Sequence, residues 1–374
     1  MKGPLMKPNA FILGFALLLT GCSHSSAPKA PAQPAEFTVE RVGSLPPYPS
    51  SKSAAINNAD EVVGRCYMIG GASDGLKWIR GRITNFGSDD KVIGDNGIND
   101  NGEIVGEMMQ NHAVRAFLWD GAHVVPLNAG PASIQSGAAA VNNTGIVAGW
   151  SRFTPSQQFV RAVIWRHHRP VTLSSPGRLV SSASGINDLG EVSGWTMVNP
   201  VKPRFAAIWI SGVMKDLDHP KNCNECAANA INNRGDVVGY MMLPGERRHA
   251  CLWRNGHLVD LGTLGGKDSE ALGINNGGDV VGWALTSNRD RHAFLYRHNK
   301  MVDLNTLIPS DSGWLLRSAA GINDTGAIAG SGMQLTPSTP DPATETDPDG
   351  GATASEFSAF VLIPTTRTRI ANRL

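Results

Sequence analysis

Four aromatic and five basic residues recur along this chain where they could bind a ligand. The aromatic residues are Trp150, Trp195, Tyr240 and Trp283, and the basic residues are Arg115, Arg161, Arg204, His249 and His292. An aromatic face stacks on a sugar ring, and a cationic side chain forms charge-assisted hydrogen bonds with an acidic group. The nine residues are therefore a candidate site for a sugar that bears acidic groups. The structural alternative is that the aromatic residues pack between sheets and the basic residues are solvated loop ends.

A nine-residue motif recurs along the chain and sets the spacing of these residues. In its fullest form it reads Ile-Asn-Asp-Asn-Gly-Glu-Ile-Val-Gly, at residues 98–106. Seven copies, 42 to 48 residues apart, begin at Ile56, Ile98, Val141, Ile186, Ile231, Ile274 and Ile322. A period of this length, with several short apolar runs inside it, is typical of a propeller or a solenoid.

Each copy of the motif predicts two short strands joined by a type I turn. Asn99 opens the turn and Gly102 closes it, as this turn type prefers, whereas the first copy has Asp60 at the glycine position. A small residue precedes every copy, which predicts innermost strands that crowd around a channel: Ala55, Gly97, Ala140, Gly185, Ala230, Gly273 and Gly321. A calcium loop is the less favoured alternative, because apolar residues follow at once where a calcium loop needs further ligands.

Two further apolar runs complete each repeat. The third run ends in Trp or Tyr, as in Ala116–Trp119, and the fourth is of the type Leu258–Gly262. Four short strands make one small antiparallel sheet. The last repeat lacks a fourth run, and residues 37–45 look like an unattached one. We therefore predict an all-β, seven-bladed β-propeller of four-stranded blades over residues 37–364, closed by the N-terminal strand, rather than an open solenoid, which would want capping repeats.

Three phrases resemble the HAF repeats of bacterial extracellular proteins. They lie at residues 97–106, 260–266 and 292–295. The resemblance covers about residues 37–362 and implies an extracytoplasmic repeat protein. It implies no catalytic residue.

Residues 1–21 predict a signal peptide. A positively charged start precedes the apolar run Ala10–Thr20, which is too short to span a bilayer as a mature helix. The run ends in Leu-Thr-Gly-Cys22, which resembles the lipobox of bacterial lipoproteins. The resemblance implies lipidation of Cys22 and, because Ser23 rather than Asp follows, an outer membrane lipoprotein that faces the periplasm or the cell surface. The alternative is an ordinary signal peptide followed by a free cysteine.

Three segments predict no packed structure. Residues 22–36 are rich in Ala, Pro and Ser and predict a tether, and residues 365–374 are predicted to be a C-terminal tail. Residues 334–356 interrupt the last repeat, and their Pro, Thr and Asp content favours a disordered insertion. The alternative is a cation site formed by Asp341, Glu345, Asp347 and Asp349.

The formal charge of +1 falls to −1 when residues 1–21, which hold two lysines and no acid, are removed. A nearly neutral protein is a poor partner for nucleic acid. We expect a monomer that is held to the membrane through Cys22, with no cofactor and no metal.

Cys223 and Cys226 predict a local disulfide outside the cytoplasm. Zinc would need a second pair of ligands, and c-type haem would need His where the chain has Ala227. A redox-active pair and two free thiols remain open. Cys66 and Cys251 are predicted to be buried as small apolar side chains.

The first functional hypothesis is a binding or scaffold module whose variable loops engage a glycan, an envelope polymer or a partner protein. The second is a carbohydrate-active hydrolase or lyase, with Glu107, Glu246 and Asp290 as the nearest acid/base candidates. The third is a structural part of an outer membrane assembly. No catalytic residue is assigned, because no spacing pairs any of the three acids with a partner.

Overall fold

The computed structural model describes residues 35–68, 73–86, 92–153, 159–335 and 357–366. These residues belong to one compact unit that starts at Ala35. The predicted signal peptide, Cys22, the tether up to residue 34, the insertion from residue 336 and the tail from residue 367 lie outside the described residues. Within the described ranges, no helix combines the length and the apolar character that crossing a bilayer requires.

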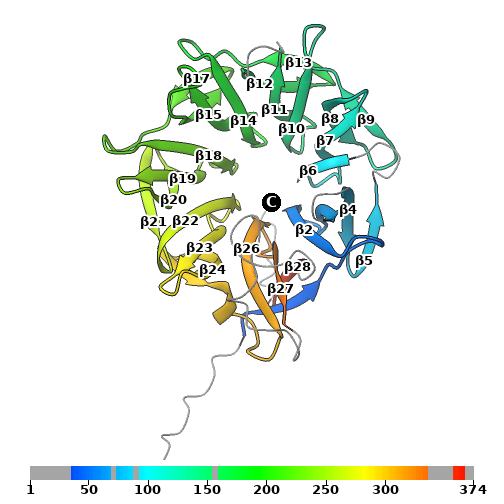
Figure 1. Cartoon of the computed structure of the whole chain (residues 1–374), viewed down its shortest axis with the longest axis vertical. Helices are drawn as coiled ribbons and strands as arrows, with labels where there is room; N and C mark the ends of the chain where they lie inside the picture. Colours follow the sequence, from blue (N-terminus) through cyan, green and yellow to red (C-terminus); the bar gives the residue numbers. More distant parts are fainter. Residues whose placement is uncertain (1–34, 69–72, 87–91, 154–158, 336–356, 367–374) are drawn as a thin grey trace, which may run out of the picture. The chain divides into compact units, whose positions relative to one another are not determined.

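Seven antiparallel sheets of four strands, blades 1 to 7, follow one another around a central channel (Figure 1). Blades 1 to 3 consist of β2 (Ser50–Ile56), β3 (Val62–Tyr67), β4 (Ser73–Ile79) and β5 (Arg82–Asn85); β6 (Val92–Ile98), β7 (Ile104–Gln110), β8 (Ala113–Trp119) and β9 (Val124–Leu127); and β10 (Gln135–Val141), β11 (Val147–Arg152), β12 (Val160–Arg166) and β13 (Arg169–Thr172). In blades 1 to 6 the first strand in the chain is the innermost, and the other three follow outward in chain order.

Blades 4 to 7 repeat the same plan. They consist of β14 (Val180–Ile186), β15 (Val192–Met197), β16 (Phe205–Ile210) and β17 (Val213–Asp216); β18 (Glu225–Ile231), β19 (Val237–Leu243), β20 (Arg247–Arg254) and β21 (His257–Gly262); β22 (Gly265–Ile274), β23 (Val280–Thr286), β24 (Arg291–Arg297) and β25 (Lys300–Asp303); and β26 (Trp314–Ile322), β27 (Ile328–Gln334), β28 (Phe357–Pro364) and β1 (Phe37–Arg41). The single-turn 3₁₀ helix η1 (Leu304–Thr306) lies between blades 6 and 7. The predicted seven-bladed propeller is confirmed.

The N-terminal strand closes the ring as predicted. β1 pairs antiparallel with β28, so that Val39 lies opposite Leu362. Phe37 is 1% exposed and packs in a core cluster with Leu304, Leu316 and Phe360. Two segments that are far apart in sequence thus share one sheet, which joins the last blade to the start of the chain and completes the ring.

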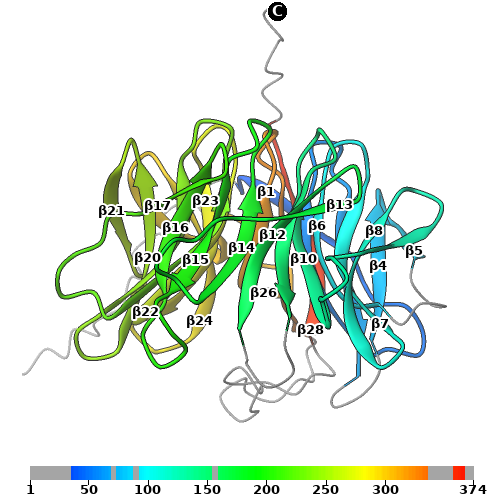
Figure 2. The same ribbon diagram turned by 90° about the horizontal axis from the view of Figure 1, so that it is seen from above.

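The repeated motif forms the predicted turn between the first two strands of each blade. The N–H of Gly102 donates to the carbonyl oxygen of Asn99 (3.1 Å), and Gly102 has a φ of +80°. Asp60 adopts a φ of +62° at the same position in blade 1. The strand order places these turns, together with those between the third and fourth strands, on one face of the ring, here called the turn face (Figure 2). The loops between second and third strands and the connections between blades form the opposite loop face.

The small residues before each motif lie where neighbouring innermost strands approach most closely. A Cβ on Gly97 would lie 3.1 Å from Cα of Ala140, and a Cβ on Gly273 would lie 3.0 Å from Cα of Gly321. The predicted crowding is therefore confirmed. The pairing also shows a register shift in every innermost strand just before this residue, as between Ala138 and Ala140.

Hydrogen bonds from backbone N–H groups to side chains join neighbouring blades. In five junctions the N–H of the alanine in a third strand donates to a side chain on the innermost strand of the next blade. The acceptors are the hydroxyls of Ser51, Ser136, Ser181 and Ser269 and the sulfur of Cys226, at 2.8–3.3 Å. Three tryptophans of third strands add a second link, because the Nε1 of each donates to a carbonyl oxygen in the connection that enters its blade. Trp165 donates to Asn128 (2.8 Å), Trp209 to Ser174 (2.9 Å) and Trp253 to Asp218 (2.6 Å).

Candidate functional site

A closed ring of seven asparagines lies at the turn-face end of the channel. Each asparagine is the first residue of a motif turn. They are Asn57, Asn99, Asn142, Asn187, Asn232, Asn275 and Asn323, and all are at least 94% buried. The Nδ2 of each donates to the carbonyl oxygen of the next, and Asn323 returns to Asn57, at 2.8–3.0 Å. The Oδ1 caps the residue's own turn, as Asn99 does for the N–H groups of Asn101 and Glu103. Each side chain thus fixes a turn and joins two blades.

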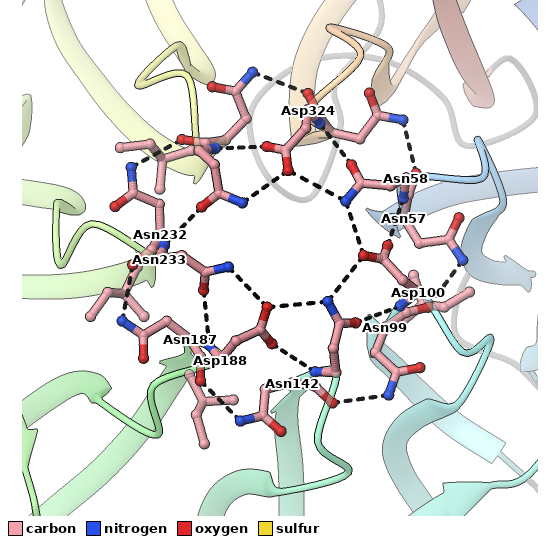
Figure 3. A pocket seen from close by; sticks show the side chains of 18 of the residues that line it. Asn57, Asn58, Asn99, Asp100, Asn142, Asn187, Asp188, Asn232, Asn233 and Asp324 are labelled. Carbon is pink, nitrogen blue, oxygen red and sulfur yellow. Dashed lines mark hydrogen bonds between the residues drawn. The ribbon is translucent and has the colours of Figure 1, made fainter. Parts of the chain in front are cut away.

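A second ring lies inside the first, as Figure 3 shows. Its members are the next residues of each motif: Asn58, Asp100, Asn143, Asp188, Asn233, Asn276 and Asp324. The backbone N–H of each donates to Oδ1 of the next, and all seven distances are 2.8 Å. The two rings line a cavity of about 170 Å³.

The three carboxylates of the second ring never adjoin one another. Oδ2 of Asp100 accepts from the amides of Asn58 and Asn143 (both 3.0 Å), and Oδ2 of Asp188 accepts from those of Asn143 (3.2 Å) and Asn233 (2.9 Å). Intervening asparagines therefore separate the negative charges and satisfy them. Among the described residues, no group of three or more His, Cys, Asp or Glu side chains has a metal-binding arrangement.

Between the rings and the loop face, the channel is lined by small and aliphatic residues of the innermost strands. This cavity has a volume of about 210 Å³. Asn96 and Asn229, which line it, donate to the carbonyl oxygens of Ala138 and Ala271 in the next blades (both 2.8 Å). These two bonds link blade 2 to blade 3 and blade 5 to blade 6 along the channel wall.

The four predicted aromatic residues occupy equivalent positions on second strands, as the shared spacing implied. Trp150, Trp195 and Trp283 are partly exposed, and Tyr240 is 5% exposed. The Nε1 of Trp150 donates to Oε1 of Glu107 in the preceding blade (3.3 Å). The other three rings are each covered by an arginine: Arg204 lies 5.4 Å from the Trp195 centroid, Arg248 lies 4.5 Å from that of Tyr240, and Arg291 lies 4.3 Å from that of Trp283.

The predicted basic residues belong to two sets, because neighbours in a strand point to opposite sides of the sheet. Arg204 precedes its strand's alanine by two residues and covers an aromatic ring. The other four precede it by one. Of these, Arg115 and Arg161 donate to the carbonyl oxygens of Ser133 (3.3 Å) and Arg178 (2.8 Å).

The two histidines bond acids of their own fourth strands. Nδ1 of His249 lies 2.9 Å from Oδ2 of Asp260, and Nδ1 of His292 lies 2.6 Å from Oδ2 of Asp303. Sequence reasoning missed Arg248 and Arg291, which stand one residue earlier and do cover the rings. Alternation along the strand was the signal that could have found them.

A charged network links blades 4, 5 and 6 on the loop-face side of these rings. Oε1 of Glu225 accepts from Arg204 Nε (3.0 Å) and from the hydroxyl of Tyr240 (2.7 Å). Arg248 pairs with Glu270 of the next blade (2.8 Å). Burial and the hydrogen bond to Glu225 raise the pKa of Tyr240, so its hydroxyl is a donor at neutral pH. Of the five predicted basic residues, Arg204 thus lies against a predicted aromatic ring. The arginines on the other two rings and the acids Glu225 and Glu270 were not among the predicted site residues.

An apolar patch adjoins this network on blade 4. Leu179, Val198 and Val201 are 44%, 46% and 88% exposed. The N–H of Leu179 donates to the carbonyl oxygens of Met197 and Val198, so the first two lie side by side. Val201 belongs to the loop that joins Trp195's strand to Arg204. The patch was not among the residues predicted from the sequence.

Cys223 and Cys226, for which the sequence predicts a local disulfide, are free and buried in the structure. Cys226 instead accepts the N–H of Ala206 where most other blades have a serine. The hydrogen bond between the two thiols lowers the pKa of Cys223 and raises that of Cys226. Cys66 and Cys251 are fully buried, as predicted, and Cys251 packs in the same core cluster as Cys223 and Cys226.

The three acids of the enzyme hypothesis lie in different blades. Burial raises the pKa of Glu107 on β7, against the hydrogen bond from Trp150. Glu246 and Asp290 lie in the loops after β19 and β23. No hydrogen bond or ion pair in the described part of the chain joins any two of them.

Residues 180–370 match a family described as "Protein of unknown function (DUF3466)". This segment makes up just over half of the chain. The chain belongs to the DUF3466 family. The matched segment begins at the first residue of β14, so it contains the aromatic and charged network of blades 4 to 6. No curated protein matches the sequence of this DUF3466 protein.

Several solved structures are similar in fold to this DUF3466 protein. A puromycin-hydrolysing peptidase from Mycobacterium tuberculosis is 12% identical, with a TM-score of 0.53 over 87% of this chain and 55% of the peptidase. The β-propeller domain of the Trilobed protease from Pyrococcus furiosus is 12% identical, with a TM-score of 0.44 over 67% of this chain and 82% of that one. The six-bladed fungal lectin of Aleuria aurantia is 11% identical, with a TM-score of 0.40 over 72% and 96%. At these identities the similarity concerns the fold alone.

Proposed function

We propose that this DUF3466 protein is a binding module whose loop face at blade 4 holds a partner protein of the cell envelope. The observation that carries the proposal is the group of exposed aliphatic side chains, Leu179, Val198 and Val201, beside the Trp195–Arg204 pair. Trp and Arg are enriched at the centres of protein interfaces, and adjoining aliphatic residues supply apolar area. The arginines that cover the aromatic faces occupy the position that a stacked sugar would need, which favours a protein over a glycan at this place.

Photo-crosslinking from the whole protein in its native membrane tests the proposal. A photoreactive residue replaces Val201 on the loop face or, as the matched control, Val213, which is 61% exposed and lies at the turn-face end of the same blade. We expect one discrete protein adduct from position 201 and none from position 213. Val198→Asp should abolish the adduct, because it places a charge in the apolar patch. Equal adducts from both positions, or binding of a glycan that Val198→Asp leaves unchanged, would contradict the proposal.

We also propose that Cys22 carries the lipid that holds the module at the outer membrane. The support is the lipobox-like sequence, and several acyl chains on one residue give a firm anchor without a membrane-spanning helix. Cells grown with an alkyne fatty acid should label the protein, and Cys22→Ser should lose both the label and membrane association. Membrane association that survives Cys22→Ser would contradict the lipid anchor.

A further inference from the structure

Two arginines of blade 5 converge on a groove between blades 5 and 6. The groove lies on the turn face and has a volume of about 460 Å³. Arg234, from the motif turn, and Arg254, the last residue of β20, form one wall with Asp236. Gly278 and Tyr296 belong to blade 6 on the other side. The size is within the range of small-molecule sites, about 300–1,000 Å³.

One buried carboxylate holds both guanidinium groups. Oδ2 of Asp236, whose side chain is 6% exposed, lies 3.0 Å from Nη2 of Arg234 and 3.2 Å from Nε of Arg254. Two positive charges therefore face one negative charge. Asp279 on the opposite wall adds no free negative charge, because Arg297 pairs with it at 3.0 Å.

Most of the hydrogen-bond donors on the two arginines are left for a ligand. A guanidinium has five N–H groups, and it presents them in a planar fork that fits a carboxylate. In the part of the chain that the structure describes, Asp236 is the one partner found for each guanidinium, and it engages one nitrogen of each. Both side chains are partly exposed, at 49% and 37%, so a solute can reach them.

Gly278 leaves the space into which the two arginines point. A Cβ at this position would collide with Nη2 of Arg234 and lie 2.7 Å from Nη2 of Arg254. The equivalent glycines in neighbouring blades have different surroundings. Gly235 has Glu191 as its nearest side chain (3.4 Å), and Gly190 has a single Arg166 nitrogen at 3.8 Å. The convergence of two guanidiniums is therefore particular to this junction among those compared.

We propose that the groove binds a small sugar acid, whose carboxylate takes the unused N–H donors of Arg234 and Arg254. Charge-assisted, forked hydrogen bonds of this kind are among the stronger polar contacts in proteins. Asn255, His298 and Asn299 line the same groove and supply polar groups for the hydroxyls of the sugar. The groove lies on the face opposite the loop-face patch, so the two proposals stand or fall separately.

Calorimetric titration of the whole protein with glucuronate tests the proposal. We expect saturable binding that weakens with added salt, and no binding of glucose, which lacks the carboxylate. Arg254→Gln should weaken binding about ten- to hundredfold, because a hydrogen bond to a charged group is lost. Arg254→Lys, which keeps the charge but not the fork, should recover part of the affinity.

Arg166→Gln is the matched control. Arg166 ends β12 as Arg254 ends β20, but Ile146 stands in blade 3 where blade 5 has Asp236. This variant should bind glucuronate as the parent does. If Arg254→Gln unfolds the protein, Arg234→Gln, whose side chain is more exposed, gives the same measurement.

Four outcomes would overturn the proposal. The first is no saturable binding of glucuronate, and the second is equal binding of glucose. The third is affinity for glucuronate that neither Arg254→Gln nor Arg234→Gln changes. Inorganic phosphate that binds where glucuronate does not would also overturn it, because the groove would then be a simple anion site.

Discussion

The asparagine rings on the turn face and the arginine-covered aromatic rings toward the loop face follow different rules of repetition. The first-ring position is Asn in all seven blades. The aromatic position is occupied in four blades, and an arginine covers it in three. The asparagine that joins each blade to the next is needed in every blade and is therefore present in all seven. An aromatic residue that a ligand or partner contacts is needed only in the blades that form the binding site.

Burial separates the two regions in the same way. Each first-ring asparagine is buried and donates through Nδ2 to the next turn of the ring, while its Oδ1 accepts within its own turn, as Asn99 shows. The arginine–glutamate pairs of blades 4 to 6 are partly exposed. Loss of a buried hydrogen-bonding group is costly, whereas partly exposed ion pairs contribute little to stability. Mutations in the asparagine rings or in the closing strand should therefore lower stability, whereas mutations of the loop-face pairs should leave stability nearly unchanged.

The largest effect is expected at the closing strand. Phe37→Ala removes a fully buried aromatic side chain from the core that joins β1 to blade 7. It should lower the free energy of unfolding by about 3–5 kcal/mol, measured by urea denaturation. Thr38→Ala, at an exposed position of the same strand, should change it by less than about 0.5 kcal/mol. Equal effects of the two changes would mean that β1 is not a closure element.

The first asparagine ring comes next. Asn142→Ala removes the Nδ2 bond to Asn187 and the Oδ1 bonds to Thr144 and Ile146. It should cost about 2–4 kcal/mol, since several buried groups lose their partners. Asn143→Ala, in the more exposed second ring, should cost about 1 kcal/mol. If Asn142→Ala left the free energy of unfolding unchanged, the asparagine ring would be no more important for stability than the loop-face pairs.

Cys226 offers a smaller, chemical test of the junctions. Cys226→Ser should change stability by less than about 1 kcal/mol, because the hydroxyl can accept the N–H of Ala206 as serines do elsewhere in the ring. Cys226→Ala leaves that buried N–H without its acceptor and should cost about 1–3 kcal/mol. The measurement is urea denaturation under reducing conditions. A larger loss with Ser than with Ala would refute the acceptor role.

The loop-face pairs should matter least for stability. Arg248→Gln breaks the partly exposed pair with Glu270 and should change the free energy of unfolding by about 1 kcal/mol or less. A loss as large as that from Asn142→Ala would show that this network also holds the blades together.

A pH effect of similar size is expected at Asp303. Burial raises its pKa, but hydrogen bonds from His292 and Asn305 outweigh this and hold the pKa below its ordinary value. An acid with a lowered folded-state pKa stabilises the fold above its unfolded pKa, near 4, and loses that contribution as pH falls through the folded value. Asp303→Asn should therefore be less stable than the parent at pH 7, and its stability should fall less steeply below about pH 4. Parallel pH curves for the two proteins would contradict this.

The repeat period, the turn type and the ring closure were all predictable from the sequence, because each is a local pattern or a simple count. Asn99 and Gly102 determine a turn within four residues, and the missing fourth strand of the last repeat matches the spare strand at Phe37–Arg41. The aromatic positions were predictable for the same reason. The side of the sheet to which each base points was predicted wrongly for His249 and His292, although alternation along the strand could have shown it, since a shift of one residue separates His249 from Arg248.

By itself, the sequence determined the four-stranded blade and the number of blades, because strands, turns and the crowding of innermost strands depend on residues that are close in sequence. Only the tertiary structure determined which group the Nδ2 of each first-ring asparagine contacts. The carboxamide that caps Asn99's own turn also reaches the carbonyl of Asn142, 43 residues away. The meeting of Arg234, Arg254 and Gly278 was decided in the same way. A contact between blades depends on the angle at which two sheets meet, and only the closed ring determines that angle.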